Sequence, residues 1–290
     1  MSDDGYDDGN GDDYGEERFR GKPKRGPRGR ARMDALRDQS GPDAGLAKLR
    51  ERGLVHEIVG ELKSGKEADV VLARGEAGLI ALKIHRDPSA GGFRPDAVYL
   101  EGRRMPRGRL RKVLDRGARA GLSADLALWV LHETKTLWEL HRAGVPVPRP
   151  LLGPGAHEIL DAGRIVPMAF IGDPDGTPAP RLADTQPTPK EAQDAWRQAK
   201  DAAAAMLRAG IVHGDLSAWN LLWHDGRIVV VDVPQAVTVQ DSPHAAQLFT
   251  RDVRSLVDSV RPMGIDEDPD EVEAELRVRA GLPPRGPFPF

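Results

Sequence analysis

The sequence predicts an α+β fold of two lobes, a strand-rich N-lobe and a mainly helical C-lobe, with a cleft between them. Residues 55–84 alternate apolar and polar side chains between glycine-containing turns, which is typical of consecutive strands. Helical periodicity appears once in the middle of the chain, at 125–142, and again from residue 188 onward. Because strands and helices concentrate in different halves of the 290-residue chain, we expect them to segregate into lobes.

The predicted N-lobe with its hinge comprises residues 46–172. Its strands are expected to turn at Gly60, at Gly65 and at residues 75–78, and the charged stretch that follows, 86–120, carries only weak structural signals.

Later in the N-lobe, the predicted helix 125–142 ends before Gly144 and Pro146. Residues 151–171 contain two short strand-like runs around a turn at 161–163.

The predicted C-lobe comprises residues 173–265. Thr188, Pro189 and Glu191 form the pattern of a capped helix start, with Thr188 as the N-cap and Glu191 closing a capping box. Gly210 is expected to end this helix.

A hairpin follows within 211–232, with its turn at 225–226, and another helix is expected at 242–260. The acidic and then proline-rich residues 266–290 are interpreted as a C-terminal tail.

The first 45 residues are predicted to form a disordered tail. Residues 1–17 contain eight acidic and no basic side chains, whereas 18–32 contain eight basic and no acidic ones. Such segments bury too little apolar surface to fold. The basic arm 18–32 is a candidate contact for RNA or the ribosome, and the alternative is a solvated arm neutralised by its own acidic half.

Composition excludes several classes of function. The 42 basic and 45 acidic side chains give a net charge of −3, which excludes a globally basic nucleic-acid-binding surface. The absence of cysteine excludes disulfides, thiolate zinc sites and cysteine nucleophiles. Without an apolar run of about 18 residues or a secretory signal pattern, we expect a cytoplasmic protein.

Three oxygen-bearing side chains form the most specific motif of the sequence. Asp215 precedes Asn220 by five residues on a predicted loop, and Asp232 ends an otherwise apolar strand twelve residues later. Hard oxygen donors of this kind suit Mg²⁺ held together with substrate phosphates. The spacing is that of a kinase catalytic loop and its metal-binding aspartate, so the two-lobed fold is predicted to be protein-kinase-like.

A lysine and a glutamate support this interpretation independently. Lys83 lies on a predicted strand, and Glu133 lies in the middle of the apolar stripe of the helix 125–142. A carboxylate buried without a cation is costly, so we expect Glu133 to pair with Lys83. Kinases use such a pair to direct a lysine at the α- and β-phosphates of ATP.

With these motifs together, the sequence resembles the RIO family of atypical serine/threonine protein kinases, in particular its first subgroup, which lacks a preceding winged-helix domain. The matching segments occur in the family's order at 64–70, 81–86, 129–137, 168–172, 178–180, 211–222 and 231–237.

The resemblance implies the following roles. Lys83 would contact the ATP phosphates with Glu133 orienting it, and Asp215 would be the catalytic aspartate. Asn220 and Asp232 would hold Mg²⁺, and Asp232 is also a candidate phosphate acceptor. The remaining contacts to ATP would come from Ser64 in the phosphate loop and from the hinge residues Met168, Ala169 and Ile171.

The predicted function is therefore ATP- and Mg²⁺-dependent phosphoryl transfer, either as a serine/threonine protein kinase or as an ATPase switch. Two alternatives remain open at this stage. One is a small-molecule phosphotransferase resembling aminoglycoside and choline kinases, and the other is an ATP-gated module that binds RNA or the ribosome.

Overall fold

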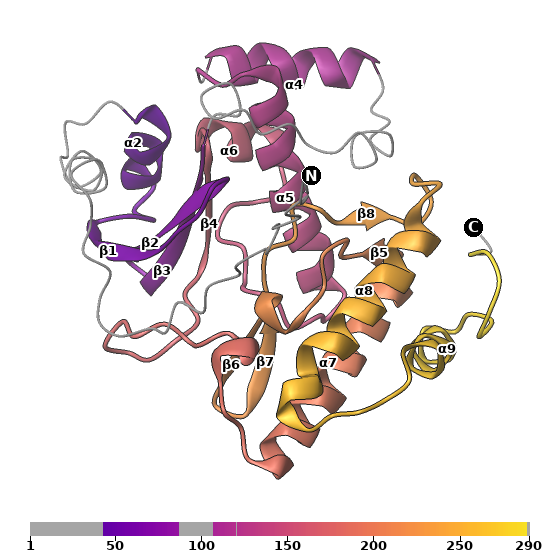
Figure 1. Ribbon diagram of the computed structural model, residues 1–290. Helices are drawn as coiled ribbons and strands as arrows, with labels where there is room; N and C mark the ends of the chain where they lie inside the picture. The colour runs from indigo at the N-terminus through magenta and orange to yellow at the C-terminus, as the bar shows by residue number, and fades with distance from the viewer. Residues whose placement is uncertain (1–42, 87–106, 120, 289–290) are drawn as a thin grey trace, which may run out of the picture.

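The computed structural model describes residues 43–86, 107–119 and 121–288, and its chain path is shown in Figure 1. The predicted arm 18–32 and nearly all of the predicted tail 1–45 lie outside the described residues.

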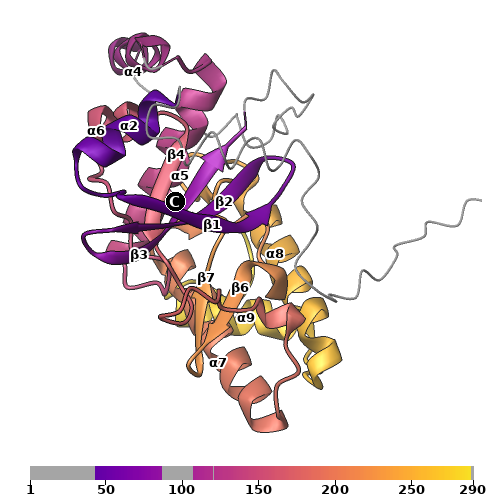
Figure 2. The same ribbon diagram turned by 90° about the vertical axis from the view of Figure 1, so that its left-hand side faces the viewer.

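The N-lobe is built on a four-stranded antiparallel sheet in the order β1-β2-β3-β4, and Figure 2 shows this sheet with β1 and β2 toward the viewer. Two of the expected turns are present, since Gly65 follows β1 and Gly75 pairs with Gly78 at the next turn. The turn expected at Gly60 is wrong, because this glycine lies inside β1 at a shift of register against β2. The strands are β1 (Glu57–Ser64), β2 (Ala68–Gly75), β3 (Gly78–His85) and β4 (Ile165–Ala169).

Within the described residues, four helices accompany this sheet, and three of them were not predicted as helices. The helix α5 (Ala124–Arg142) matches the expected 125–142. The helix α2 (Ala44–Glu51) follows an N-cap at Asp43, and α4 (Arg107–Arg119) lies within the segment that gave weak signals. The helix α6 (Ala156–Asp161) replaces the first of the two strands expected in 151–171.

Physical reasons explain two of these differences, those at α6 and α4. The six residues of α6 make less than two turns, so their apolar pair Ile159 and Leu160 has no detectable period. The helix α4 is rich in arginine and contains Gly117, which weakens its helical signal. A Cβ at Gly117 would lie 2.6 Å from the Cβ of Ala127 in α5, so the glycine permits close approach of the two helices.

The C-lobe follows the predicted order of helix, hairpin and helix. The capping box at Thr188 and Glu191 is present, and the Asp225–Gly226 turn joins the two hairpin strands. The main elements are α7 (Pro189–Arg208), β5 (Ile211–Val212), β6 (Leu221–His224), β7 (Arg227–Val230), β8 (Val237–Thr238), α8 (Ala245–Val260) and α9 (Pro269–Arg279), with short 3₁₀ turns at Leu182–Asp184, Ala218–Asn220 and Arg261–Met263.

The helix α5 belongs to the cores of both lobes. Near its N-terminus, Leu126 and Val130 pack with residues of α6 and β4. Near its C-terminus, Leu137 and Leu140 join the large apolar cluster that contains α7 and α8. Figure 1 shows α5 running between the sheet on one side and the C-lobe helices on the other.

The segment 266–290 contains a helix and is not merely a tail. Asp268 caps α9, Pro269 occupies its first turn, and Val272 and Leu276 are buried in the C-lobe core. The Asp268-Pro269 pair is a typical helix start, but the acidic composition of the segment favoured its interpretation as a tail.

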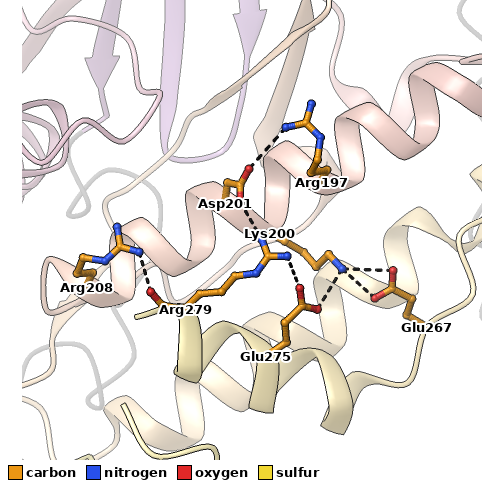
Figure 3. A network of polar contacts seen from close by, with 7 residues as sticks. All are labelled: Arg197, Lys200, Asp201, Arg208, Glu267, Glu275 and Arg279. Atoms are coloured by element: carbon orange, nitrogen blue, oxygen red, sulfur yellow. Dashed lines mark hydrogen bonds and ion pairs between the residues drawn. The ribbon is translucent and has the colours of Figure 1, made fainter. Parts of the chain in front are cut away.

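Ion pairs hold α9 against α7, as Figure 3 shows. Lys200 Nζ lies 3.2 Å from Glu267 Oε2 and 3.1 Å from Glu275 Oε2, and Arg279 Nη1 lies 2.7 Å from Asp201 Oδ1. Arg208 donates a hydrogen bond of 2.7 Å to the carbonyl of Arg279. These contacts fix the orientation of a helix that the apolar core alone would anchor along one face only.

Within the described residues, no helix is both long enough and apolar enough to span a membrane.

Truncation of Leu276 tests whether α9 is part of the folded lobe. Leu276→Ala should lower the free energy of unfolding by about 2–5 kcal/mol, because it leaves a cavity in the core. Val278→Ala is the matched control, since Val278 is 59% exposed and its loss should change stability by less than about 0.5 kcal/mol. Urea unfolding followed by circular dichroism measures both; equal effects of the two changes would contradict a core role for α9.

Candidate active site

A lysine and two carboxylates lie at the centre of the site, where the lobes meet. Lys83 Nζ on β3 is 2.6 Å from Glu133 Oε1 on α5, which is the pair expected from the buried stripe of that helix. The same Nζ is also 2.6 Å from Oδ1 of Asp232, which follows β7 in the C-lobe. One ammonium group therefore joins three separate elements of the fold.

The local backbone directs Asp232 toward this lysine. Asp232 has a φ of 67°, in the left-handed region, so the chain turns sharply as it leaves β7. The preceding Val231 is fixed on both sides, because its N–H donates to the Asn220 carbonyl at 2.9 Å and its carbonyl lies 3.2 Å from His213 Nε2.

These contacts keep all three groups ionised. Burial alone would lower the pKa of Lys83, but the Glu133 and Asp232 carboxylates outweigh it and raise that pKa. Burial would raise the pKa of Glu133, and Lys83 with His85 lowers it instead. The charge of Lys83 lowers the pKa of Asp232 to about 2, although burial opposes this shift.

The loop that carries Asp215 is held by hydrogen bonds to side chains of α8. Asp252 accepts hydrogen bonds from the N–H groups of Gly214 at 2.7 Å and Leu216 at 3.0 Å. Ser259, also on α8, accepts one from the Ala218 N–H at 2.8 Å. Burial raises the pKa of the Asp252 carboxyl despite these two donors.

Sequence reasoning missed Asp252, although a signal was available. Asp252 interrupts the apolar stripe of α8 between Phe249 and Leu256, just as Glu133 interrupts that of α5. The argument that assigned Glu133 a partner applies equally to this buried carboxylate.

Asp215 and Asn220 are in contact through the Asn220 amide group. Asn220 Nδ2 donates to the Asp215 carbonyl at 2.7 Å and to its carboxylate Oδ2 at 3.1 Å. With its nitrogen committed to Asp215, the amide presents its oxygen on the opposite side. The structure thus brings together the loop pair Asp215 and Asn220, and the Val231–Asn220 hydrogen bond ties that pair to the residue before Asp232.

The donor set fits a divalent cation bound jointly with phosphates. Asn220 offers an amide oxygen, and Asp232 Oδ2 makes no hydrogen bond to another residue within the described ranges. Nowhere among residues 43–86, 107–119 and 121–288 do three His, Asp or Glu side chains form a ready-made metal cage. A site with so few protein ligands suits Mg²⁺, which commonly completes its shell with water and phosphate oxygens.

Ser64 lies at the end of β1, at the turn into β2. Its hydroxyl donates to Asp69 Oδ1 at 2.7 Å and accepts a 3.0 Å hydrogen bond from Arg86 Nη2. The side chain therefore stabilises the turn, and its proposed contact with phosphate is a prediction.

The predicted hinge residues lie at the end of β4 and just beyond it. Met168 is paired with Ala81 of β3, and the Ala169 N–H donates to the Arg149 carbonyl at 2.8 Å. The Ile171 carbonyl accepts from the Ala179 N–H at 3.0 Å, whereas the Ile171 N–H donates to no residue in the described part of the chain. A backbone donor remains there for a ligand.

Comparison with known proteins agrees with this geometry. A family model described as the RIO domain matches residues 74–272. The RIO-type serine/threonine-protein kinase Rio1 of Haloferax volcanii is 34% identical over 231 residues, which cover 79% of this chain and 72% of that protein. The chain belongs to the RIO family. This confirms the expected family and, with it, a two-lobed kinase that uses ATP.

Eukaryotic RIO1 kinases are similar over a comparable length. The Chaetomium thermophilum protein is 30% identical over 76% of this chain, and the Homo sapiens protein is 31% identical over 73%. The matched regions are 42% and 35% of those longer proteins. A solved kinase-domain structure covers 78% of this chain and 74% of its own, with 10% identity and a TM-score of 0.47.

Removal of the lysine charge tests the electrostatics of this RIO-family site. In Lys83→Met, the pKa of Asp232 should rise from about 2 toward or above its ordinary value of 3.8, because the largest lowering influence is gone and burial remains. In the unaltered protein, the stabilising contribution of Asp232 is complete above pH 3.8 and is lost as the pH falls toward 2.

Carboxyl-detected ¹³C NMR titration measures this shift, with Asp232 assigned by its loss in Asp232→Asn. Asp175 is the internal control, because its pKa is lowered by hydrogen bonds from Thr177 and should not respond to Lys83. An unmoved Asp232 resonance would show that Lys83 does not set its ionisation.

Proposed function

We propose that this chain transfers the γ-phosphoryl group of ATP, bound with Mg²⁺, to a serine or threonine hydroxyl of a protein. The observation that carries the proposal is Lys83, held at 2.6 Å by Glu133 from the N-lobe and at 2.6 Å by Asp232 from the C-lobe. A cation placed where the lobes meet is suited to the negatively charged phosphates of a nucleotide.

The residues around Lys83 would divide the remaining tasks. Glu133 would keep the ammonium group in place while it contacts the α- and β-phosphates. Asn220 and Asp232 would hold Mg²⁺, which when bound neutralises phosphate charge. Asp215 would orient the acceptor hydroxyl and take its proton, and the hydrogen bond from Asn220 supports this role by fixing the carboxylate.

Adenine would bind at the segment that joins the lobes. The Ile171 N–H has no acceptor in the described part of the chain, which supports a hydrogen bond from it to a purine ring nitrogen. Met168 and Ala169 would line the same side of the adenine. Ser64 at the β1–β2 turn would approach the phosphates from above.

Asparagine substitutions test the two aspartate assignments. Asp215→Asn and Asp232→Asn should each lower ATP-dependent phosphorylation of a general protein substrate by about 100-fold or more, because a general base or a metal ligand is lost. Activity is measured as ³²P transfer and as ADP release in parallel, with Mg²⁺, Mn²⁺ or no divalent ion added.

Asp225→Asn is the matched control. Asp225 also has a positive φ, 50°, but lies at the tip of the β6–β7 hairpin with its side chain 87% exposed. Asparagine tolerates this conformation, so the control should retain full activity. Full activity of Asp232→Asn would refute the metal assignment.

Chemical lability of the label separates the two acceptors. Transfer to a hydroxyl gives a phosphoester that survives hydroxylamine, whereas attack of the Asp232 carboxylate on the γ-phosphorus would release ADP and leave an acyl phosphate that hydroxylamine cleaves. We expect the label on the added protein substrate to resist hydroxylamine. Label found only on the chain itself, cleaved by hydroxylamine and absent in Asp232→Asn, would instead indicate an ATPase switch.

A further inference from the structure

A buried histidine contacts the same glutamate that holds Lys83. Side chains two residues apart on a strand point to the same face, so His85 emerges beside Lys83 on β3. His85 Nε2 lies 2.6 Å from Glu133 Oε2, and the two side chains are 2% and 3% exposed. One oxygen of Glu133 therefore faces Lys83, and the other faces His85.

The two atoms depend on each other. His85 Nε2 and Glu133 Oε2 are both shielded from solvent, and in the described part of the chain neither atom forms a hydrogen bond of regular geometry. A buried polar atom without a partner is costly, and the 2.6 Å approach between these two atoms is the contact that can offset this cost for each of them.

The surroundings of His85 leave its ring little freedom. Its backbone N–H donates to the Arg164 carbonyl at 3.0 Å, just before β4. Glu133 from α5 contacts the ring, Glu67 from the turn between β1 and β2 is close enough to interact with it electrostatically, and Lys83 lies on the same face of β3. The histidine is thus a fixed point on a paired strand, whereas Glu133 is a long side chain with three rotatable bonds.

We propose that His85 is a positioning residue for the phosphate-binding lysine. By occupying Oε2, His85 stops the Glu133 carboxylate from rotating and keeps Oε1 directed at Lys83. Without this contact, Glu133 turns or shifts, and Lys83 remains held by Asp232 alone, away from the nucleotide. The inference rests on the proposed function, because that function is what makes Lys83 a ligand of the ATP phosphates.

Two substitutions at His85 separate the effect of its contact with Glu133 from the effect of the space that its side chain fills. His85→Leu fills the space but removes the N–H donor, whereas His85→Gln retains an N–H at a similar reach. We expect His85→Leu to raise the KM for ATP and lower kcat, for a combined loss in kcat/KM of about 10- to 100-fold. His85→Gln should recover most of that loss, to within roughly 3-fold of the unaltered chain.

Ile80→Val is the matched control for stability. Ile80 lies on β3 in the apolar core beneath the sheet and is 2% exposed, so its truncation loosens the same strand without touching Glu133. Its thermal midpoint should fall while its KM for ATP stays unchanged. A rise in KM in Ile80→Val equal to that in His85→Leu would overturn the proposal, because it would show a merely structural effect.

A double variant tests whether His85 acts through Glu133. In a Glu133→Gln background, adding His85→Leu should cause no further loss in kcat/KM, whereas a full additional loss would overturn the proposal. If Lys83→Ala turns over ATP normally, the proposed function itself fails. If Lys83→Ala is inactive while His85→Leu is normal, only the present inference fails.

An NMR measurement on the unaltered chain keeps the proposal testable if His85→Leu does not fold. The His85 Nε2 proton should give a slowly exchanging, downfield imidazole resonance, because it is buried against a carboxylate. A rapidly exchanging His85 ring proton would overturn the proposal.

Discussion

The arrangement of the whole site depends on the cost of placing the Lys83 ammonium group in a largely water-free position. A charge at such depth is tolerated only when opposite charges compensate for its lost hydration. Glu133 and Asp232 provide that compensation from different lobes, each at 2.6 Å. The position of β3 relative to α5 and the sharp turn after β7 therefore serve the same purpose, which is to bring a carboxylate to the buried ammonium group of Lys83.

In the 213–220 loop, buried backbone groups likewise need partners that replace their lost contacts with water. Two N–H groups of the 213–220 loop would be buried without partners if Asp252 did not accept from both, and Arg251 on the same helix donates to the Gly214 carbonyl. Asp215 itself makes contact with Asn220 and is otherwise directed by a loop that α8 holds in shape. The position of Asp215 is thus set by the packing of its loop against α8 and by its contact with Asn220.

The sequence allowed the lobes, the hairpin, three main helices and the Lys83–Glu133 pair to be predicted, because each follows from a period or a cap within a short window. The helix α6 was missed because its six residues are fewer than two turns, and α9 because acidic composition outweighed its Asp-Pro start. His85 escaped notice because its partner is 48 residues away on another element, and neither the strand nor the helix alone shows that their side chains meet. Contacts of this kind become visible only when the fold brings the elements together.

The dual membership of α5 restricts how the two lobes move. Leu137 and Leu140 lie in the C-lobe core while the other end of the helix packs on α6 and β4. An outward swing of α5 would return both leucines to water, at a cost of about 3–6 kcal/mol. Inhibitors that bind only when this helix is displaced would lose much of their binding free energy to that displacement. Compounds that fit the site with α5 in its observed position are therefore the better starting point for selective inhibitors.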